Sequence, residues 1–330
     1  MIYIGKSPYR VSLLGGGSDL DWFVRSEGYG VCLGYSLEQY SYSVLNILPP
    51  FAGKGILEYS TREEYQNINE IVHPIVREVL CHFNINNYIE LKTFGFASGG
   101  SGLGGSSAFL LSLVSSLSNA FKLNLSKEKI IADSCFIEIN KLNKPIGKQD
   151  QYLCANSGLN SFTFFDNNSV IKNELSTVKK KTLERLTDNF YLIPTNKRRN
   201  SESVLKNFKN DKDSLDMIKE IREIANRFIK FEDERDSKIE EFFNSSVKES
   251  WLIKKSMNKV MDNRLSDHYE LINSSIPNNW IRLIGAGNGG YFLVSSKVNQ
   301  DEINKLKGQN GIKGIFKASI SKEGLSGFKI

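Results

Sequence analysis

The chain has 330 residues, 40% of them hydrophobic and 24% charged, which is the composition of an ordinary globular protein. Its 43 basic and 37 acidic residues are interspersed apart from short clusters, so the net charge of +6 is a weak argument for nucleic acid and fits an anionic small-molecule substrate at least as well. We expect no nucleic-acid partner. No apolar run approaches the roughly 20 residues of a membrane span, and the N-terminus lacks the apolar segment of a signal peptide. We therefore expect a cytoplasmic protein with no membrane partner.

Cysteine and histidine usage argues against several kinds of site. The four cysteines lack CxxC spacing and have apolar neighbours, which predicts buried free thiols rather than disulfides or metal ligands. The three histidines are scattered, so neither a zinc site nor a histidine-based catalytic triad is indicated. The residues are Cys32, Cys81, Cys135, Cys154, His73, His82 and His268.

Strand and helix patterns alternate along the first half of the chain. Apolar and β-branched residues predict strands at residues 10–14, 30–36 and 41–48. Apolar residues at helical spacing predict one amphipathic helix over residues 63–83, and a strand follows at residues 88–94. Two further helices are expected at residues 107–121 and 127–141, before a strand at residues 159–165 and a turn at residues 166–169.

The chain is longer than a typical single core, so two domains are expected. Residues 172–188 are polar and rich in lysine, and we place the boundary there, giving domains of residues 1–175 and 176–330. Beyond it, the pattern predicts a strand at residues 190–194 and charged helices at residues 213–231 and 237–261. A glycine-rich segment at residues 281–294 is flanked by apolar runs, which indicates a strand, a loop and a second strand.

The most informative segment, residues 97–108, reads ASGGSGLGGSSA. Glycines let consecutive backbone N–H groups converge on one anion, and the helix that follows adds its unpaired donors and positive dipole end. Such a loop suits the phosphates of a nucleotide, and a hydroxyl of Ser106 or Ser107 could reach a metal bound to them. The residues we assign to nucleotide binding are Gly100, Ser101, Gly102, Leu103, Gly104, Gly105, Ser106 and Ser107.

Two other phosphate-binding patterns fit this segment less well. Gly100, Gly102 and Gly105 also spell the dinucleotide fingerprint, but the second strand and acidic residue that it requires do not follow. No GxxxxGK[ST] occurs, which excludes a Walker A loop. A glycine-rich turn without a ligand remains the alternative.

The next candidate site combines two acidic residues with a turn that follows a proline. Residues 147–151 read GKQDQ, which predicts a turn into a short helix with Asp150 beside Lys148 and two amides. A carboxylate in such a place can orient or deprotonate a hydroxyl. Glu138 precedes it near the end of a helix, and a Mg²⁺–nucleotide site needs hard oxygen ligands of this kind. Either acid alone could equally be a solvated surface charge.

The N-terminal strand runs into a third candidate, GGGSD at residues 15–19. Glycines there allow a bulky ligand to lie against the backbone, and Asp19 could accept hydrogen bonds from neighbouring hydroxyls. Arg10 on the strand could pair with an interior acid. A tight hairpin with a capping aspartate is the alternative.

Taken in order, these motifs resemble those of the GHMP sugar and metabolite kinases, and most of all the heptose 7-phosphate kinases within that family. The resemblance rests on SPYRVSLLGGGSD at residues 7–19, GSGLGGSSA, GKQDQ, TNKRRNSESVL at residues 195–205, WLIKKS at residues 251–256 and LIGAGNGGY at residues 283–291. It covers nearly the whole chain. It implies an α+β fold, with an N-terminal domain like domain 2 of ribosomal protein S5 and a ferredoxin-like C-terminal domain. The cleft between the domains would be the active site.

The resemblance also implies roles for residues. Asp150 would be the catalytic base or orienting group with Arg10 as its charge partner, and Ser107 and Glu138 would hold Mg²⁺ beside ATP. We hypothesise that Arg198 or Arg199, in a basic cluster, binds a substrate phosphate, although a solvated loop is an equal alternative. The residues assigned to the sugar are Gly16, Gly17, Ser18, Asp19, Lys148, Arg198, Arg199 and Gly287.

The expected function is an ATP- and Mg²⁺-dependent kinase that phosphorylates the anomeric hydroxyl of D-glycero-D-manno-heptose 7-phosphate, for polysaccharide biosynthesis. A kinase for an unphosphorylated sugar such as fucose or galactose is one alternative. A non-catalytic sugar sensor of the same fold is another. The sequence does not indicate an oligomeric state.

Overall fold

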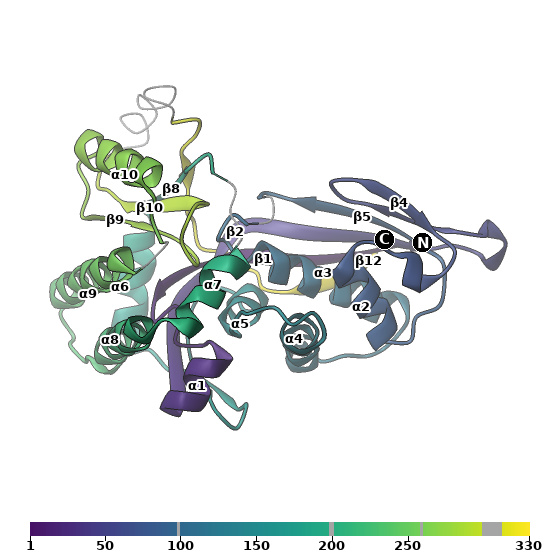
Figure 1. Ribbon diagram of the computed structural model, residues 1–330, viewed down its shortest axis with the longest axis horizontal. Coiled ribbons are helices and arrows are strands. Elements are labelled where there is room, and N and C mark those ends of the chain that lie inside the picture. The colour runs from purple at the N-terminus through teal and green to yellow at the C-terminus, as the bar shows by residue number, and fades with distance from the viewer. Residues whose placement is uncertain (98–99, 198–200, 258–259, 299–311) are drawn as a thin grey trace.

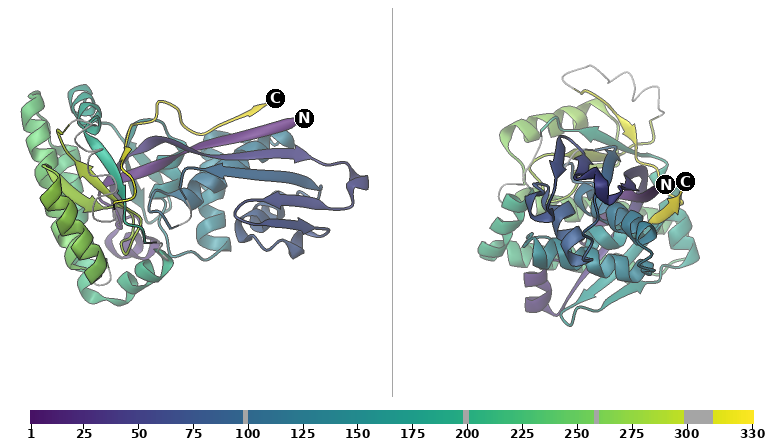
Figure 2. Two further views of the ribbon diagram at one scale, coloured as in Figure 1. Left: turned by 90° about the horizontal axis from the view of Figure 1, so that it is seen from above. Right: turned by 90° about the vertical axis from the view of Figure 1, so that its right-hand side faces the viewer.

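A computed structural model describes residues 1–97, 100–197, 201–257, 260–298 and 312–330. Figures 1 and 2 show an elongated molecule with a large sheet and its helices along one part, and a small sheet with long helices at the other end. The two chain ends lie side by side on the large sheet, where Ile2 and Ile330 exchange backbone hydrogen bonds. In the part of the chain that is described, no helix is both long enough and apolar enough to cross a membrane.

The large sheet has the strand order β12-β1-β2-β5-β3-β4, and β6 pairs with β2 and β7. The long strand β2 joins the parts of this sheet, because its second half pairs with β5 and its first half with β6. The strands are β1 (Ile2–Leu14), β2 (Tyr29–Ile47), β3 (Gly55–Glu58), β4 (Arg62–Tyr65), β5 (Ile89–Gly95), β6 (Leu159–Phe165), β7 (Val170–Asn173) and β12 (Ser326–Lys329).

Helices pack against this sheet, and the buried helix α3 lies directly on β1 and β2. Leucines of α3 and apolar residues of β5 and α2 form one of the hydrophobic cores. The helices of this part are α1 (Asp21–Glu27), α2 (Pro74–His82), α3 (Gly105–Ala120), α4 (Lys127–Cys135) and α5 (Gln149–Ala155). Short 3₁₀ turns at η1 (Pro50–Ala52) and η2 (Ile68–Glu70) and a π-helix at η3 (Phe136–Lys141) complete it.

The small sheet has the order β11-β8-β10-β9, all antiparallel. Aromatic side chains join it to α9, where Phe243 packs against Phe190 and Trp280. Its strands are β8 (Phe190–Pro194), β9 (Trp280–Leu283), β10 (Tyr291–Ser295) and β11 (Phe316–Lys317), and the helices are α6 (Thr177–Thr187), α7 (Ser201–Asn210), α8 (Lys212–Lys230), α9 (Asp236–Ser256) and α10 (Asn263–Ser275).

Some expected elements differ from those observed. The single helix predicted over residues 63–83 is wrong: its first residues form β4, and α2 begins only at Pro74. Proline is favoured in the first helical turn, while residues 62–65 find backbone partners in β3. The strands predicted at residues 30–36 and 41–48 are one continuous strand, and α9 ends at Ser256 rather than near residue 261. Cys81, expected to be buried, is exposed.

Strand β1 is irregular where it approaches the candidate site. Its pairing with β2 shifts register between Pro8 and Arg10 and again between Ser12 and Leu14. Bulges of this kind bend a strand and re-aim its side chains, and they are common beside active sites. Arg10 and Ser12 consequently line the same cavity, although residues on either side of them are buried in a hydrophobic core.

Candidate active site

A cavity of about 280 Å³ lies where the glycine loop, β1 and α5 meet side chains from α7, α8 and the late glycine loop. Its described wall includes apolar side chains of α7 and α8, among them Phe208, Ile218 and Ile221. The same wall includes three acids and four cations. They are Asp19, Glu138, Asp150, Arg10, Lys144, Lys254 and Arg282.

The glycine loop has the backbone form expected for anion binding. Gly100, Gly102 and Gly104 have φ angles of 81°, 83° and 73°, which other residues rarely adopt. Gly104 is the N-cap of α3, and no side chain of the described residues caps that helix end. The first N–H groups of α3 are therefore available to a ligand at its N-terminus.

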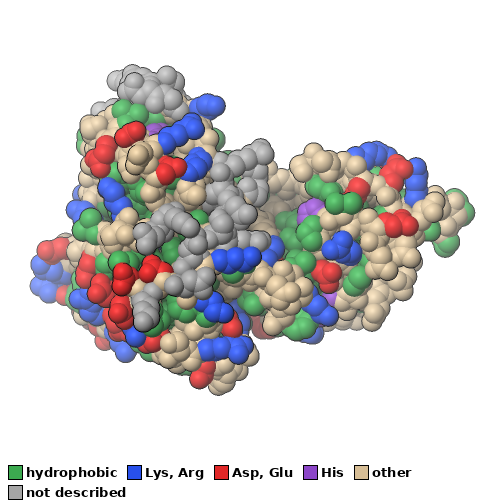
Figure 3. Space-filling model, in the orientation of Figure 1, with side chains coloured by type: hydrophobic (Ala, Val, Ile, Leu, Met, Phe, Trp, Pro, Cys, Tyr) green, Lys and Arg blue, Asp and Glu red, His purple; other side chains and the backbone are tan. Residues whose placement is uncertain are grey.

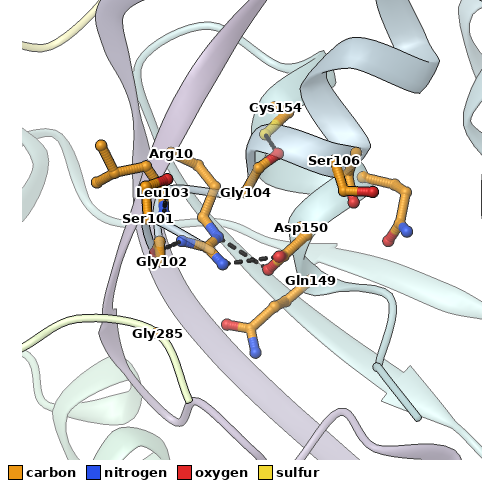
Figure 4. Close-up of polar contacts among 12 residues, drawn as sticks. Arg10, Ser101, Gly102, Leu103, Gly104, Ser106, Gln149, Asp150, Cys154 and Gly285 are labelled. Carbon is orange, nitrogen blue, oxygen red and sulfur yellow. Dashed lines mark hydrogen bonds and ion pairs between the residues drawn. The ribbon is translucent and has the colours of Figure 1, made fainter. Parts of the chain in front are cut away.

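Arg10 and Asp150 face each other beside this loop (Figure 4). Nε of Arg10 donates to Oδ1 of Asp150 at 2.8 Å, and Nη2 donates to Oδ2 at 2.7 Å. Nη1 donates to the carbonyl of Gly102, so one guanidinium holds both the carboxylate and the loop. Burial opposes the charge of Arg10, but its neighbours, above all Asp150, together raise its pKa. The carboxylate is thus fixed in orientation beside the loop.

Glu138 is fully buried in the π-helix η3, yet it is surrounded by donors. Ser106 donates to its Oε1 and Ser107 to its Oε2, each at 2.6 Å, and Gln151 donates to Oε2 at 2.7 Å. Lys144 Nζ lies 2.8 Å from Oε1. Burial alone would raise the pKa of Glu138, but Lys144 and the serine hydroxyls hold it below its ordinary value.

Asp19 contacts the first residue of α5. Its Oδ2 accepts the backbone N–H of Gln149 at 2.9 Å, and its Oδ1 accepts Nε2 of Gln149 at 2.7 Å. Burial raises the pKa of Asp19 to about 6 in spite of these bonds. Asp19 therefore links the N-terminal glycine turn to the helix that carries Asp150.

The residues around Glu138 fit a divalent cation held together with phosphates. The ammonium of Lys144 already lies between the Glu138 carboxylate and Oγ of Ser106, from which it is 2.6 Å, so the pocket accommodates a positive charge. Carboxylate and hydroxyl oxygens are ligands that Mg²⁺ accepts. Among the described residues, no group of three or more His, Cys, Asp or Glu gathers to hold a metal. The remaining ligands would have to come from a nucleotide and water.

Most of the sequence-predicted site residues line the cavity, but several do not. Ser18 is fully buried, and its hydroxyl lies within hydrogen-bonding distance of the carbonyl oxygens of Gly15 and Val31. Leu103 is a core residue whose carbonyl accepts the Arg10 N–H. Lys148 faces a second cavity and donates to Asn168, while Gly287 lies against Val260 outside the cavity wall. Arg198 and Arg199 lie outside the described residues.

The sequence reading missed three of the four cations of the wall. Lys144 stands just before Pro145 in a turn and carries no motif. Lys254 is one of several lysines on an amphipathic helix. Arg282 could have been recognised from the sequence, because a charged residue inside the apolar strand WIRL is unusual and needs an explanation.

The late glycine loop contacts the first one. A side chain at Gly290 would place its Cβ 2.2 Å from the carbonyl oxygen of Ser101, and Gly290 itself has a φ of 97°. Lys254 Nζ donates to the carbonyl of Gly285 in the same late loop. Glycine at position 290 is therefore required for the two loops to touch.

Known proteins resemble this chain in sequence and in fold. Residues 70–158 match the family model of the GHMP kinases N terminal domain, and these residues include the glycine loop, Glu138 and Asp150. The chain has the GHMP kinase fold, and its residues 70–158 match the N-terminal domain of the GHMP kinases. The α+β class and the family resemblance predicted from the sequence are confirmed.

Individual relatives are similar over the whole chain. D-glycero-alpha-D-manno-heptose 7-phosphate kinase of Campylobacter jejuni is 26% identical over 98% of both chains. Among solved structures, a D-glycero-D-manno-heptose 1-phosphate kinase from Bacteroides thetaiotaomicron has a TM-score of 0.73 at 19% identity, covering 100% of this chain and 99% of that one. Galactokinase of Lactococcus lactis, solved with galactose, has a TM-score of 0.69 at 15% identity, covering 100% and 95%. The structural similarities concern the fold.

Proposed function

We propose that the protein transfers the γ-phosphoryl group of ATP to a hydroxyl of a sugar, with Mg²⁺. The observation that carries this proposal is the Arg10–Asp150 pair beside the glycine loop, with the Ser106–Ser107–Glu138 cluster in the same cavity. Phosphoryl transfer depends on positioning and charge neutralisation more than on covalent chemistry of the protein. Positioning and charge neutralisation would come from the glycine loop around the phosphates, the oriented carboxylate of Asp150 and the pocket for a cation.

The sugar hydroxyl would lie against the Asp150 carboxylate. Its oxygen forms a bond to the γ-phosphorus while the bond from that phosphorus to the β,γ-bridging oxygen breaks, and ADP leaves. The hydroxyl proton passes to Asp150, or Asp150 orients the hydroxyl and the proton leaves later. Arg10 holds the carboxylate by two hydrogen bonds and keeps it from rotating away from the loop.

Backbone N–H groups of the glycine loop and of the first turn of α3 would bind the phosphates of ATP. Glu138 with the hydroxyls of Ser106 and Ser107 would hold Mg²⁺, which neutralises charge on the β- and γ-phosphates when bound. Asp19, together with the backbone of Gly16 and Gly17, lines the cavity where the sugar would lie.

For the substrate we propose D-glycero-D-manno-heptose 7-phosphate, phosphorylated at its anomeric hydroxyl to give the 1,7-bisphosphate. The proposal is supported by the similarity to the Campylobacter jejuni enzyme over 98% of both chains. Turnover of free galactose or fucose would favour a kinase for an unphosphorylated sugar. Sugar binding without any turnover would favour a non-catalytic sugar sensor.

The test is ADP release with MgATP and a panel of acceptors: heptose 7-phosphate, mannose 6-phosphate, mannose, galactose and fucose. We expect turnover of the phosphorylated sugars and greatest kcat/KM for the heptose. Turnover of free sugars alone would retain the kinase and reject the heptose phosphate. Sugar binding by calorimetry with no ADP release from any acceptor would reject the kinase.

A further inference from the structure

Arg282 is a buried cation for which the described residues offer no acidic partner. Its strand β9 is otherwise apolar, and only 3% of the residue is exposed. Nη1 donates to the carbonyl of Leu13, Nε has no hydrogen-bond partner, and no ion pair forms with any described carboxylate. Burial lowers the pKa of Arg282 to about 10. Because an uncompensated buried charge destabilises the folded protein, Arg282 would be stabilised by an anion that the described chain does not supply.

The position of Arg282 shows where such an anion would bind. Arg282 lines the active-site cavity, as do Ser12 and Lys254. Oγ of Ser12 is buried without a hydrogen-bond partner and is therefore a second unused polar group on this wall. Two further described cations of the cavity are paired with acids, Arg10 with Asp150 and Lys144 with Glu138.

Arg282 contacts a different part of β1 from the residue that holds the glycine loop. Arg282 reaches the backbone of β1 at Leu13, whereas Arg10 of the same strand turns to Asp150 and Gly102. The two positions are three residues apart, or about 10 Å at the usual rise of a strand. An anion at Arg282 would thus be a different group from the phosphoryl group transferred beside Asp150.

We propose that Arg282, together with Ser12 and Lys254, binds a phosphate ester that the acceptor sugar already carries, at the end remote from the reacting hydroxyl. The inference rests on the proposed function and makes Arg282 a residue that selects phosphorylated acceptors. A guanidinium binds phosphate through two parallel hydrogen bonds, and the Ser12 hydroxyl adds a third donor. Lys254 contributes charge while it holds the late loop through Gly285.

The experiment compares the variant Arg282→Gln with the wild type for phosphorylated and unphosphorylated acceptors. We expect KM for mannose 6-phosphate or heptose 7-phosphate to rise about 10- to 100-fold, since a hydrogen bond to a charged group contributes roughly 1.5–3 kcal/mol. KM for MgATP and for the free sugar should change less than about twofold. Arg227→Gln is the matched control, because that arginine is 57% exposed on α8 and pairs with Glu249.

Two results would overturn the inference. An equal rise in KM for phosphorylated and free sugar would mean that Arg282 only supports the fold, and a rise confined to MgATP would assign it to the nucleotide. If Arg282→Gln does not fold, Arg282→Lys and Ser12→Ala are measured instead, and both should weaken the phosphorylated acceptor selectively. No selectivity in either would reject the assignment.

A binding measurement separates this inference from the proposed function. Calorimetry with mannose 6-phosphate and with mannose, in the absence of ATP, needs no turnover. Wild-type protein that binds the phosphate ester more tightly, with the preference lost in Arg282→Gln, would support the anion site even if no acceptor is phosphorylated. Turnover with no such preference would retain the kinase and reject the role of Arg282.

Discussion

The ammonium of Lys144 lies 2.8 Å from Oε1 of Glu138, in the place where a nucleotide-bound cation would approach that carboxylate. Glu138 is fully buried, and Lys144 is only 16% exposed. The pair therefore compensates a buried negative charge in the protein alone, and a divalent cation would have to share or displace the lysine. Because both charges are buried and close together, removing either one leaves the other uncompensated and destabilises the folded protein strongly.

Replacing Lys144 by Met should destabilise the free protein and increase its response to ligand. Removing one partner of a buried ion pair costs about 3–5 kcal/mol, because the other charge is left unpaired. Mg²⁺ with a non-hydrolysable ATP analogue should then raise the melting temperature of Lys144→Met by more than it raises that of the wild type.

The matched control for that experiment is Lys141→Met, since Lys141 forms no ion pair within the described residues and lies over the ring of Phe136. Its melting temperature and ligand response should stay near those of the wild type. An equal ligand response in Lys144→Met and the wild type would show that the cation does not replace the lysine. The double variant with Glu138→Gln should lose the response altogether.

Asp150 and Arg10 should affect turnover far more than nucleotide binding. Asp150→Asn keeps the shape of the side chain and removes its charge, and loss of a catalytic base or orienting group typically lowers kcat by about 10²- to 10⁴-fold. Arg10→Lys keeps a charge but loses the two-point contact with Asp150, so we expect a fall of about 10²-fold. Steady-state kinetics with varied MgATP would show KM for ATP within about threefold of the wild type.

Asp216→Asn is the control for these two variants, because Asp216 is 80% exposed on α8. Near-normal kcat in Asp150→Asn would contradict the role given to Asp150. A matching rise in KM for ATP in Arg10→Lys would instead show that Arg10 acts mainly through its bond to Gly102 in the glycine loop.

Sequence patterns anticipated the parts of the molecule whose cause is local. The glycine loop follows from residues that allow positive φ, and α8 follows from an apolar stripe at helical spacing. Residues 63–65 were wrongly predicted as helix because their strand exists only through pairing with β3, a contact that helical periodicity cannot report. The domain boundary between residues 175 and 176 stays a proposal. Strand β12 lies after that boundary in the sequence but pairs with β1, which lies before it.

The polar contacts of the site depend on packing between distant segments. Glu138 and Lys144 meet because a π-helix and a turn bring them together, and Arg282 reaches Leu13 from a strand 269 residues later in the chain. Short motifs could name Asp150, its partner Arg10 and the serines, because these residues stand in motifs that resemble those of a known family. They could not show that Lys144 neutralises Glu138 or that Arg282 reaches Leu13, because Lys144 and Arg282 carry no role in those motifs.

Asp19 should make stability fall as the pH rises from about 4 to about 6. Its pKa is raised from 3.8 to about 6 in the folded protein, so the folded state binds more protons than the unfolded state within that window. The free energy of unfolding then decreases with pH, and above pH 6 this cost is complete at about 3 kcal/mol. Asp19→Asn removes the charge and should remove this dependence.

Denaturant unfolding of the wild type and Asp19→Asn at pH 4, 5, 6 and 7 would measure the difference. The variant can keep its contacts, because Oε1 of Gln149 has no partner and would accept from the new amide after rotation of the Gln149 side chain. Asp21→Asn, with a 48% exposed carboxylate paired to Arg25, serves as the control. A gap between wild type and Asp19→Asn that does not grow with pH would refute the raised pKa.

Contact between the two glycine loops predicts a specific effect of Gly290→Ala. The added Cβ would lie 2.2 Å from the carbonyl oxygen of Ser101, in the loop that would bind the phosphates. The clash must displace one loop or the other, so we expect KM for MgATP to rise about tenfold or more and the protein to lose stability. Gly53→Ala is the matched control, because Gly53 also has a positive φ, 70°, but nothing within 4 Å of the added Cβ.

Both variants bear the strain of a left-handed residue, roughly 1–2 kcal/mol, so a fall in melting temperature alone would not separate them. The comparison is decided by kinetics. If Gly290→Ala and Gly53→Ala lose similar stability but only the former weakens MgATP, the late loop supports the phosphate loop through this contact. Unchanged KM for MgATP in Gly290→Ala would mean that the glycine loop holds its shape without the late loop, through Arg10 and the N-terminus of α3 alone.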